Sequence, residues 1–379
     1  IRSCLVGSEM CIRDSVVLYH TGLGFFPGGF IGVDIFFVLS GFLITHYIYA
    51  QLQLGHFSFG TFYLRRVKRL IPAFLVVSIA TLFIGAWLLL PNDLIYHAKL
   101  VGLAFISIGN FYLANTTAGY FSRDVEEIPF LHMWSLSVEE QFYLVWPLML
   151  ILAFRYLKHR LLYVAAVLFV IMVGVSEWHV AVDANRGFYL ISTRAHELMV
   201  GAILALVWER RGVLPNWLVN VLVVISLGVL VGSALFLESS HAFLGLSSVW
   251  VCLATAFLIY AGAEKNKLTS FLSTALLTGL GKISYSLYLW HWPLFAFYHY
   301  SYGEQSAFSA LVLIALSVGL SILTWFWVEQ PARKKQERAL FTWLKLYILP
   351  VIALFAVYTF IDETDGAKFR FGEKVDKIA

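Results

Sequence analysis

Charged residues are scarce in this 379-residue chain, and their scarcity excludes most classes of soluble protein. Asp, Glu, Lys and Arg together make up 13% of the sequence, whereas hydrophobic residues make up 60%. A soluble globular domain has about 25% charged and roughly 45–50% apolar residues. The apolar excess, with a mean hydropathy of +0.79, therefore indicates an integral membrane protein.

Cysteine is also rare, with Cys4, Cys11 and Cys252 as the three residues of this type. No two of them form a CxxC pair, so neither a zinc site nor a disulfide framework is supported, and we expect no metal. Lys and Arg occur in short clusters between apolar runs. This pattern predicts the lipid bilayer as a partner and argues against nucleic acid.

Long apolar runs recur along the whole sequence. A helix needs about 20 mostly apolar residues to cross a bilayer, so these runs predict an all-α, polytopic transmembrane helix bundle with ten or eleven crossings. The predicted spans are 16–25, 30–52, 70–91, 134–154, 162–182, 194–208, 217–237, 247–263, 276–299, 307–328 and 343–361.

Basic residues alternate between successive loops and so predict the orientation of the chain. Clusters follow the second, fourth, sixth, eighth and tenth spans, and an excess of Lys and Arg marks cytoplasmic loops. The alternation holds only if the apolar segment 100–114 does not cross. We therefore predict that 92–133 is an extracytoplasmic excursion with a re-entrant or buried piece.

The two ends of the sequence differ in character from the middle. Residues 1–15 are polar and mixed, and they lack the layout and cleavage site of a signal peptide. We interpret 1–15 as a non-native segment, 16–338 as the membrane domain and 343–361 as an extra transmembrane helix. The polar 362–379 is interpreted as the start of an extracytoplasmic linker.

Two ionisable residues near the start of the chain are candidates for function, because such residues are costly inside a membrane. His20 can take a proton from a hydroxyl near neutral pH, although a hydrogen bond to a neighbouring helix explains it equally well. Asp34 lies in GGFIGVDIFFVLSGFLIT, where packing accounts for the glycines, which permit close helix approach, but not for the aspartate.

A basic cluster lies in RRVKRLIPAF, which contains Arg65, Arg66 and Arg69. Anionic lipid would attract it to the membrane surface. The alternative is a clamp for the diphosphate and 3′-phosphate of coenzyme A. We expect Pro72 in the first turn of the following helix.

The fourth predicted span opens with WSLSVEEQFYLVWP. Ser137 and Glu140 have the spacing of a capping box, which would give Glu140 a structural role. Glu139 remains available, and a carboxylate at the outer membrane surface would orient a histidine or an acceptor hydroxyl.

Two further polar sets lie within predicted spans. Arg194 and Glu197 are three positions apart and predict an ion pair within one helix. Ser284, Tyr288 and His291 are spaced i, i+4 and i+7, so this polar stripe should face a cavity.

In this order, the motifs resemble the bacterial acyltransferase 3 family of membrane O-acyltransferases, especially the branch that acetylates O-antigen and other surface polysaccharides. The resemblance runs from about Val16 to Arg338. It rests on YHTG, PGGFIGVDIFFVLSGFLIT, RRVKRLIPAF, WSLSVEEQFYLVWP, RAHELMVGAILA, ISYSLYLWHWPL and EQPARK.

The resemblance implies a ten-helix acyltransferase unit in the bacterial inner (cytoplasmic) membrane, with an eleventh helix and often an extracytoplasmic SGNH-type domain. Members move an acyl group, usually acetyl, from cytoplasmic acyl-CoA to an outer acceptor, here expected to be a hydroxyl of lipopolysaccharide O-antigen or another cell-surface glycan. It also implies that His20 is central to transfer and that Arg65, Arg66 and Arg69 bind the donor.

One position departs from the family. Its first helix has an arginine eleven positions before the histidine, where this chain has Glu9, and Arg13 is out of register. Either the native N-terminus has been replaced or the chain lacks this group.

In the working hypothesis, His20 is the general base and Glu139 or Asp34 orients it, with a histidine-bound acyl intermediate as an alternative. Two other classes stay open, a transporter of a small polar or lipid-linked substrate and a scaffold or sensor without chemistry. Multi-span bundles with polar midplane residues often move substrates, but no inverted repeat or pair of interrupted helices is evident here.

Overall fold

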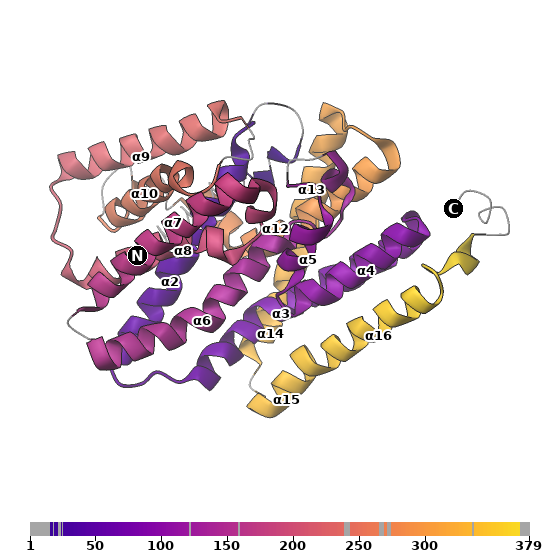
Figure 1. Cartoon of the computed structure of the whole chain (residues 1–379), viewed down its shortest axis with the longest axis horizontal. Coiled ribbons are helices and arrows are strands. Elements are labelled where there is room, and N and C mark those ends of the chain that lie inside the picture. Colours follow the sequence, from indigo (N-terminus) through magenta and orange to yellow (C-terminus); the bar gives the residue numbers. More distant parts are fainter. Residues whose placement is uncertain are drawn as a thin grey trace.

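The computed structural model describes residues 16–17, 19–21, 24, 26–120, 123–157, 160–238, 243–264, 269–270, 274–335 and 337–371. The predicted non-native segment, with Glu9 and Arg13, lies outside these residues, as do part of the first predicted span and the tail from residue 372. Within the described part, every regular element is a helix (Figure 1).

Eight helical segments of the described residues are long and apolar enough to cross a membrane, which confirms the prediction of a polytopic helix bundle. The helices within them are α2 (Gly32–Gln53), α3 (Phe59–Leu88), α6 (Met133–Leu157), α7 (Leu161–Gly187), α8 (Ile191–Val207), α9 (Asn216–Phe236), α13 (Ala307–Thr324) and α16 (Leu349–Glu363). The apolar α10 (Leu246–Ala261) is shorter, and α12 (Ala275–Tyr302) completes the bundle.

The excursion between α3 and α6 contains two short helices, α4 (Pro91–Phe105) and α5 (Gly109–Thr116). The chain reverses between them, where Ser107 has a φ of 62°. The side chain of Gln141, about two turns into α6, donates to the carbonyl oxygen of Ser107 at 2.7 Å. The segment 100–114 therefore folds back on itself beside α6, with Ile108 and Phe111 exposed near the turn, and its predicted failure to cross the membrane stays a prediction.

Two predictions of helix starts are wrong. α3 begins at Phe59, where Ser58 accepts from the amide of Thr61 at 3.5 Å. Pro72 consequently lies inside this helix instead of in its first turn. Neighbouring helices make such prolines tolerable in membrane proteins.

The predicted capping box at the start of the fourth span is also wrong. α6 begins at Met133, and the hydroxyl of Ser137 donates to the Met133 carbonyl oxygen at 3.1 Å from within the helix. Glu140 is thereby free of any capping role, and its carboxylate reaches α3 instead.

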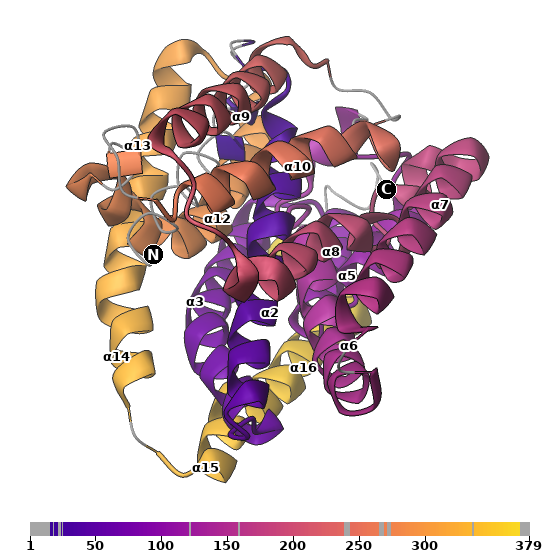
Figure 2. The same ribbon diagram turned by 90° about the vertical axis from the view of Figure 1, so that its left-hand side faces the viewer.

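The helices α2 and α8 cross in backbone contact near the centre of the bundle (Figure 2). A Cβ added at Gly41 would lie 1.9 Å from the carbonyl oxygen of Leu198, and one at Gly201 would lie 1.9 Å from that of Val38. Only glycine permits this approach, so the predicted packing role of the glycines is confirmed at Gly41. The same contact brings the polar residues of both helices together.

The predicted extra helix 343–361 is observed as a longer helical segment. It comprises α15 (Ala339–Trp343), a π-helical turn (Leu344–Ile348) and α16, and it lies alongside α4 (Figure 1). In the most apolar 18-residue stretch of this segment, only 11% of the residues are buried. In the corresponding stretch of the segment that contains α2, 83% are buried. This segment therefore flanks the bundle, whereas α2 forms its core.

Candidate active site

Two cavities lie along the path of the chain into and through α2. The first, which we call the histidine cavity, has a volume of about 440 Å³ and lies beside the segment that leads into α2. The second, the arginine cavity, has a volume of about 380 Å³ and is lined from α2 by residues between Phe36 and Tyr47.

The histidine cavity brings together His20, the aromatic rings of Tyr19, Tyr120 and Trp292, and several polar groups. Its remaining polar lining is Glu126, His299, Glu304 and Gln305. The side chain of Gln305 donates to the carbonyl oxygen of His20 at 3.1 Å.

His20 contacts two side chains through its ring nitrogens. Its Nδ1 lies 3.3 Å from the Nε2 of His291, and its Nε2 lies 3.3 Å from the hydroxyl of Tyr120. The Nδ1 of His291 faces the carbonyl oxygens of Tyr288 and Leu287, at 2.8 and 3.2 Å. The structure therefore joins His20 to His291 of the predicted polar stripe.

The rest of the stripe faces the bundle interior as well. The hydroxyl of Tyr288 donates to the carbonyl oxygen of His132 at 2.8 Å and lies 2.5 Å from the hydroxyl of Ser135. Ser284 is also buried, and its hydroxyl donates to the carbonyl oxygen of Gly281 in its own helix, at 3.1 Å.

Sequence reasoning missed His132 and Tyr120. The ring of His132 is buried 5.7 Å from the ring of His291, between centroids. The signal for it was present, because His132 directly precedes the polar run that opens α6. Tyr120 lies in an irregular segment, where no periodicity marks a residue that faces the interior.

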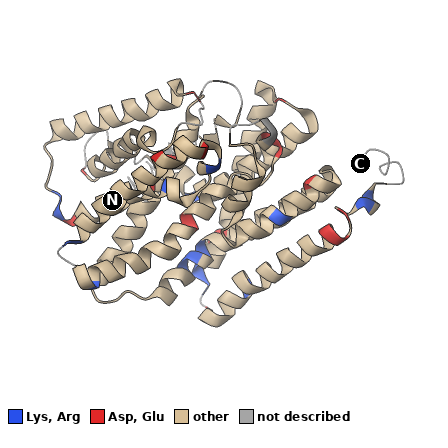
Figure 3. Ribbon diagram, in the orientation of Figure 1, with Lys and Arg blue, Asp and Glu red and all other residues tan. Residues whose placement is uncertain are grey.

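The arginine cavity is lined by all three arginines of the predicted basic cluster, Arg65, Arg66 and Arg69. Arg65 donates to the hydroxyl of Tyr47 at 3.1 Å. Figure 3 shows the basic residues gathered where α3 meets α14 (Gln330–Lys334). By the loop charges, this end of the bundle is the predicted cytoplasmic one.

Glu140 positions one of these arginines. Its carboxylate accepts from Arg66 at 2.8 Å, and the guanidinium lies 3.5 Å from the centre of the Tyr143 ring. Arg66 is thereby neutralised, whereas neither Arg65 nor Arg69 forms an ion pair within the described residues.

The predicted contact between Glu139 and His20 is wrong. Glu139 lines the arginine cavity, where its carboxylate accepts from Ser40 and from Tyr143, the latter at 2.5 Å. α6 begins at Met133, about one turn before the predicted cap Ser137, so Glu139 lies within the helix and faces the arginine cavity.

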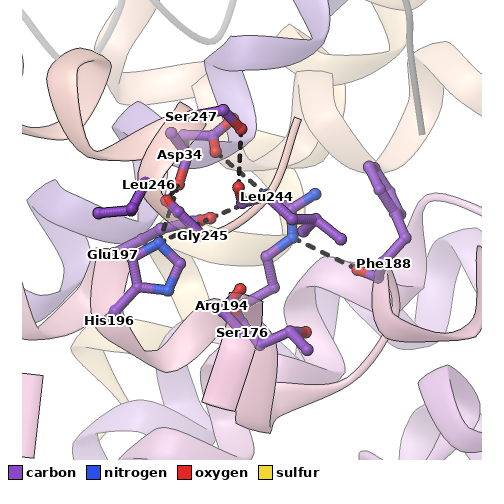
Figure 4. A network of polar contacts seen from close by, with 12 residues as sticks. Asp34, Ser176, Phe188, Arg194, His196, Glu197, Leu244, Gly245, Leu246 and Ser247 are labelled. Atoms are coloured by element: carbon purple, nitrogen blue, oxygen red, sulfur yellow. Dashed lines mark hydrogen bonds and ion pairs between the residues drawn. The ribbon is translucent and has the colours of Figure 1, made fainter. Parts of the chain in front are cut away.

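The predicted contact between Asp34 and His20 is also wrong, because Asp34 pairs with Arg194. The Nη1 of Arg194 lies 3.1 Å from Asp34 and 2.8 Å from Glu197, and all three side chains are buried (Figure 4). The predicted pair within one helix is confirmed, and Asp34 adds a partner from α2. The guanidinium also donates to the carbonyl oxygen of Phe188 at 3.3 Å.

A small void adjoins the arginine cavity. It has a volume of about 10 Å³ and is lined by Val16, Gly32, Val33, Phe36 and Tyr288. Phe36 also lines the arginine cavity. On the other side, Val16 lies one turn before His20, whose amide donates to its carbonyl oxygen at 3.2 Å.

A family model described as an acyltransferase domain, Acyl_transf_3, matches residues 15–328. The chain belongs to this acyltransferase family. It is therefore an enzyme of the membrane O-acyltransferase type. This finding argues against the transporter and the scaffold alternatives. Among the described residues, no group of three or more His, Cys, Asp or Glu side chains could hold a metal ion.

Curated relatives of this acyltransferase carry related names. The O-acetyltransferase OatA of Staphylococcus aureus is 30% identical over 86% of the chain and 56% of its own length. A putative O-acetyltransferase of the same species is 30% identical over 91% of the chain and 59% of its own length. The chain thus spans less than two thirds of these two relatives.

An uncharacterized protein of Haemophilus influenzae is 36% identical over 62% of the chain and 99% of its own length. No solved structure matches the chain.

Proposed function

We propose that the chain transfers an acetyl group from acetyl-CoA to a hydroxyl of a cell-surface glycan, across the inner membrane of a bacterium. The observation that carries the proposal is the arrangement of the two cavities. The histidine cavity precedes α2, and the arginine cavity lies along the middle of α2 with Arg65 and Arg69, which form no ion pair within the described part of the chain.

The arginine cavity suits the anionic end of acyl-CoA. Arg65 and Arg69 have no carboxylate partner among the described residues, so both retain their charge for phosphate oxygens. Charge-assisted hydrogen bonds between Arg and phosphate are roughly twice as strong as neutral ones. By the loop charges this cavity opens toward the cytoplasm, where acyl-CoA is made.

His20 has the hydrogen bonds that a general base requires. Carbonyl oxygens only accept, so the Nδ1 of His291, which faces two of them, carries a proton. In neutral His291 the Nε2 then accepts the proton of the His20 Nδ1, 3.3 Å away. This leaves a lone pair on the Nε2 of His20, which faces the hydroxyl of Tyr120 at 3.3 Å on the side of the histidine cavity.

The chemical step follows from this tautomer. The Nε2 of His20 takes the proton of the acceptor hydroxyl as its oxygen attacks the carbonyl carbon of the thioester. An ester C–O bond forms, the C–S bond breaks, and the proton passes to the CoA thiolate. The products are the acylated acceptor and free CoA, and His20 returns to its starting state.

The histidine cavity supports a glycan as the acceptor. Tyr19 and Trp292 offer aromatic faces to the C–H faces of a sugar. Glu126, Glu304 and Gln305 offer hydrogen-bond partners for its hydroxyl groups. The names of the two Staphylococcus aureus relatives support acetyl as the acyl group.

The test measures transfer of radiolabelled acetyl from acetyl-CoA to membrane glycans by vesicles that contain the chain. His20→Ala is expected to abolish the labelling. His179→Ala is the matched control, because His179 lies on α7, bonds to the carbonyl oxygen of Val175 and lines neither cavity. Equal labelling by wild type and His20→Ala would refute the proposed role of His20.

A further inference from the structure

A small void adjoins the arginine cavity and the turn that carries His20. Phe36 lines both the void and the arginine cavity, and Val16 lies one turn before His20. If CoA is anchored at the arginine cavity and the acceptor lies in the histidine cavity, their reacting atoms meet close to this void.

The lining of the void matches a short apolar group. Val16, Val33 and Phe36 contribute hydrocarbon, and Gly32 contributes no side chain. Tyr288 presents its ring, because its hydroxyl is bonded to the carbonyl oxygen of His132. Among the residues that the structure describes, no charged side chain lines it.

The size of the void is restrictive. At about 10 Å³ it has room for about one water-sized group. The first carbon atoms of an acyl chain would fill such a space, and a longer chain would meet the Phe36 or Tyr288 ring. Phe36 is 9% exposed and packed in the main core cluster, and it also borders the arginine cavity.

We propose that this void is the acyl-chain pocket of the enzyme, and that Phe36 restricts the donor to short acyl groups such as acetyl. This inference rests on the proposed function and adds a specificity-determining residue to it. The adjoining Val33 and Gly32 set the remaining dimensions of the pocket.

The test compares acetyl-, propionyl- and butyryl-CoA as donors for wild type and Phe36→Ala. One methylene in an apolar pocket changes specificity by about 10- to 200-fold, so wild type should favour acetyl over butyryl by at least about tenfold. Phe36→Ala should bring the butyryl-to-acetyl ratio close to one. Phe42→Ala is the matched control, since Phe42 is buried on the same helix and packs against Trp208.

Milder variants keep the inference testable if Phe36→Ala fails to fold. Phe36→Leu and Val33→Ala enlarge the pocket less and should shift the ratio in the same direction. Gly32→Ala should narrow the pocket and reduce even propionyl transfer. An unchanged donor ratio in the folded Phe36 and Val33 variants would overturn the assignment.

A binding measurement distinguishes a failure of this inference from a failure of the proposed function. The unreactive thioethers ethyl-CoA and butyl-CoA should compete for the chain, with ethyl-CoA the tighter in wild type and the two similar in Phe36→Ala. If neither thioether binds wild type, the proposed use of acyl-CoA fails. If both bind wild type equally, CoA recognition stands and the acyl-chain pocket is refuted.

Discussion

The Nδ1 of His20 lies 3.3 Å from the Nε2 of His291, although 271 positions separate them in the sequence. The carbonyl oxygens of Tyr288 and Leu287 fix the proton of His291 on its other nitrogen. A short chain of hydrogen bonds thus determines which nitrogen of His20 is a base.

His291→Ala should lower kcat by at least about tenfold, yet by less than loss of the base itself, since general-base catalysis contributes about 10²- to 10⁴-fold. KM for acetyl-CoA should not change. Steady-state kinetics check both values. His291→Gln should restore part of kcat, because its amide oxygen can accept the His20 proton; equal loss in both variants would indicate a structural role only.

Arg69→Ala and Arg65→Ala should each raise KM for acetyl-CoA by about tenfold or more, with kcat little changed. A hydrogen bond to a charged group is worth about 1.5–3 kcal/mol, which sets this magnitude. Donor-saturation kinetics provide the measurement. Lys68→Ala is the control, because Lys68 lies on the same helix but donates to the carbonyl oxygen of Lys335 at 2.8 Å. An equal rise in Lys68→Ala would indicate a general charge effect.

Arg194→Ala should destabilise the protein by about 3–5 kcal/mol, since it leaves buried carboxylates without their partner. Thermal unfolding in detergent should show the loss, and Arg155→Ala, at an exposed position, should not. A variant that unfolds like wild type but lacks transfer activity would instead assign Asp34, Arg194 and Glu197 to catalysis.

Gly201→Ala should destabilise the bundle by at least about 1–3 kcal/mol, because the added methyl group overlaps the backbone of α2. Gly228→Ala is the matched control, since nothing lies within 4 Å of its added Cβ. It should be neutral or stabilising by up to about 1 kcal/mol. The free energies of unfolding of the two variants are compared in paired unfolding curves. Similar values for both variants would argue against the close contact between α2 and α8.

The apolar runs predicted the helices well, because the requirement for about 20 apolar residues leaves few alternatives. Ser137 and Pro72 show where local signals failed. Both have features of helix starts, yet the apolar periodicity continues through them, and tertiary packing extends α6 and α3 past these points.

The sequence predicted which residues belong to the candidate site better than it predicted which of them contact one another. The arginines line a cavity, Tyr288 lines the small void, and His291 is buried against His20. Asp34 and Glu139 contact other residues than His20. Their partners depend on the relative register of neighbouring helices, which the sequence alone does not determine. α6 begins at Met133, about one turn before the predicted cap Ser137, and Glu139 lines the arginine cavity.

The glycine contact between α2 and α8 also limits how this molecule can move. Backbones that touch at Gly41 and Gly201, and that are tied by Arg194, have to travel as one rigid body. Any widening beside Phe36 must then come from rotation of its side chain or displacement of α12, while α2 and α8 stay fixed as the frame against which that motion occurs.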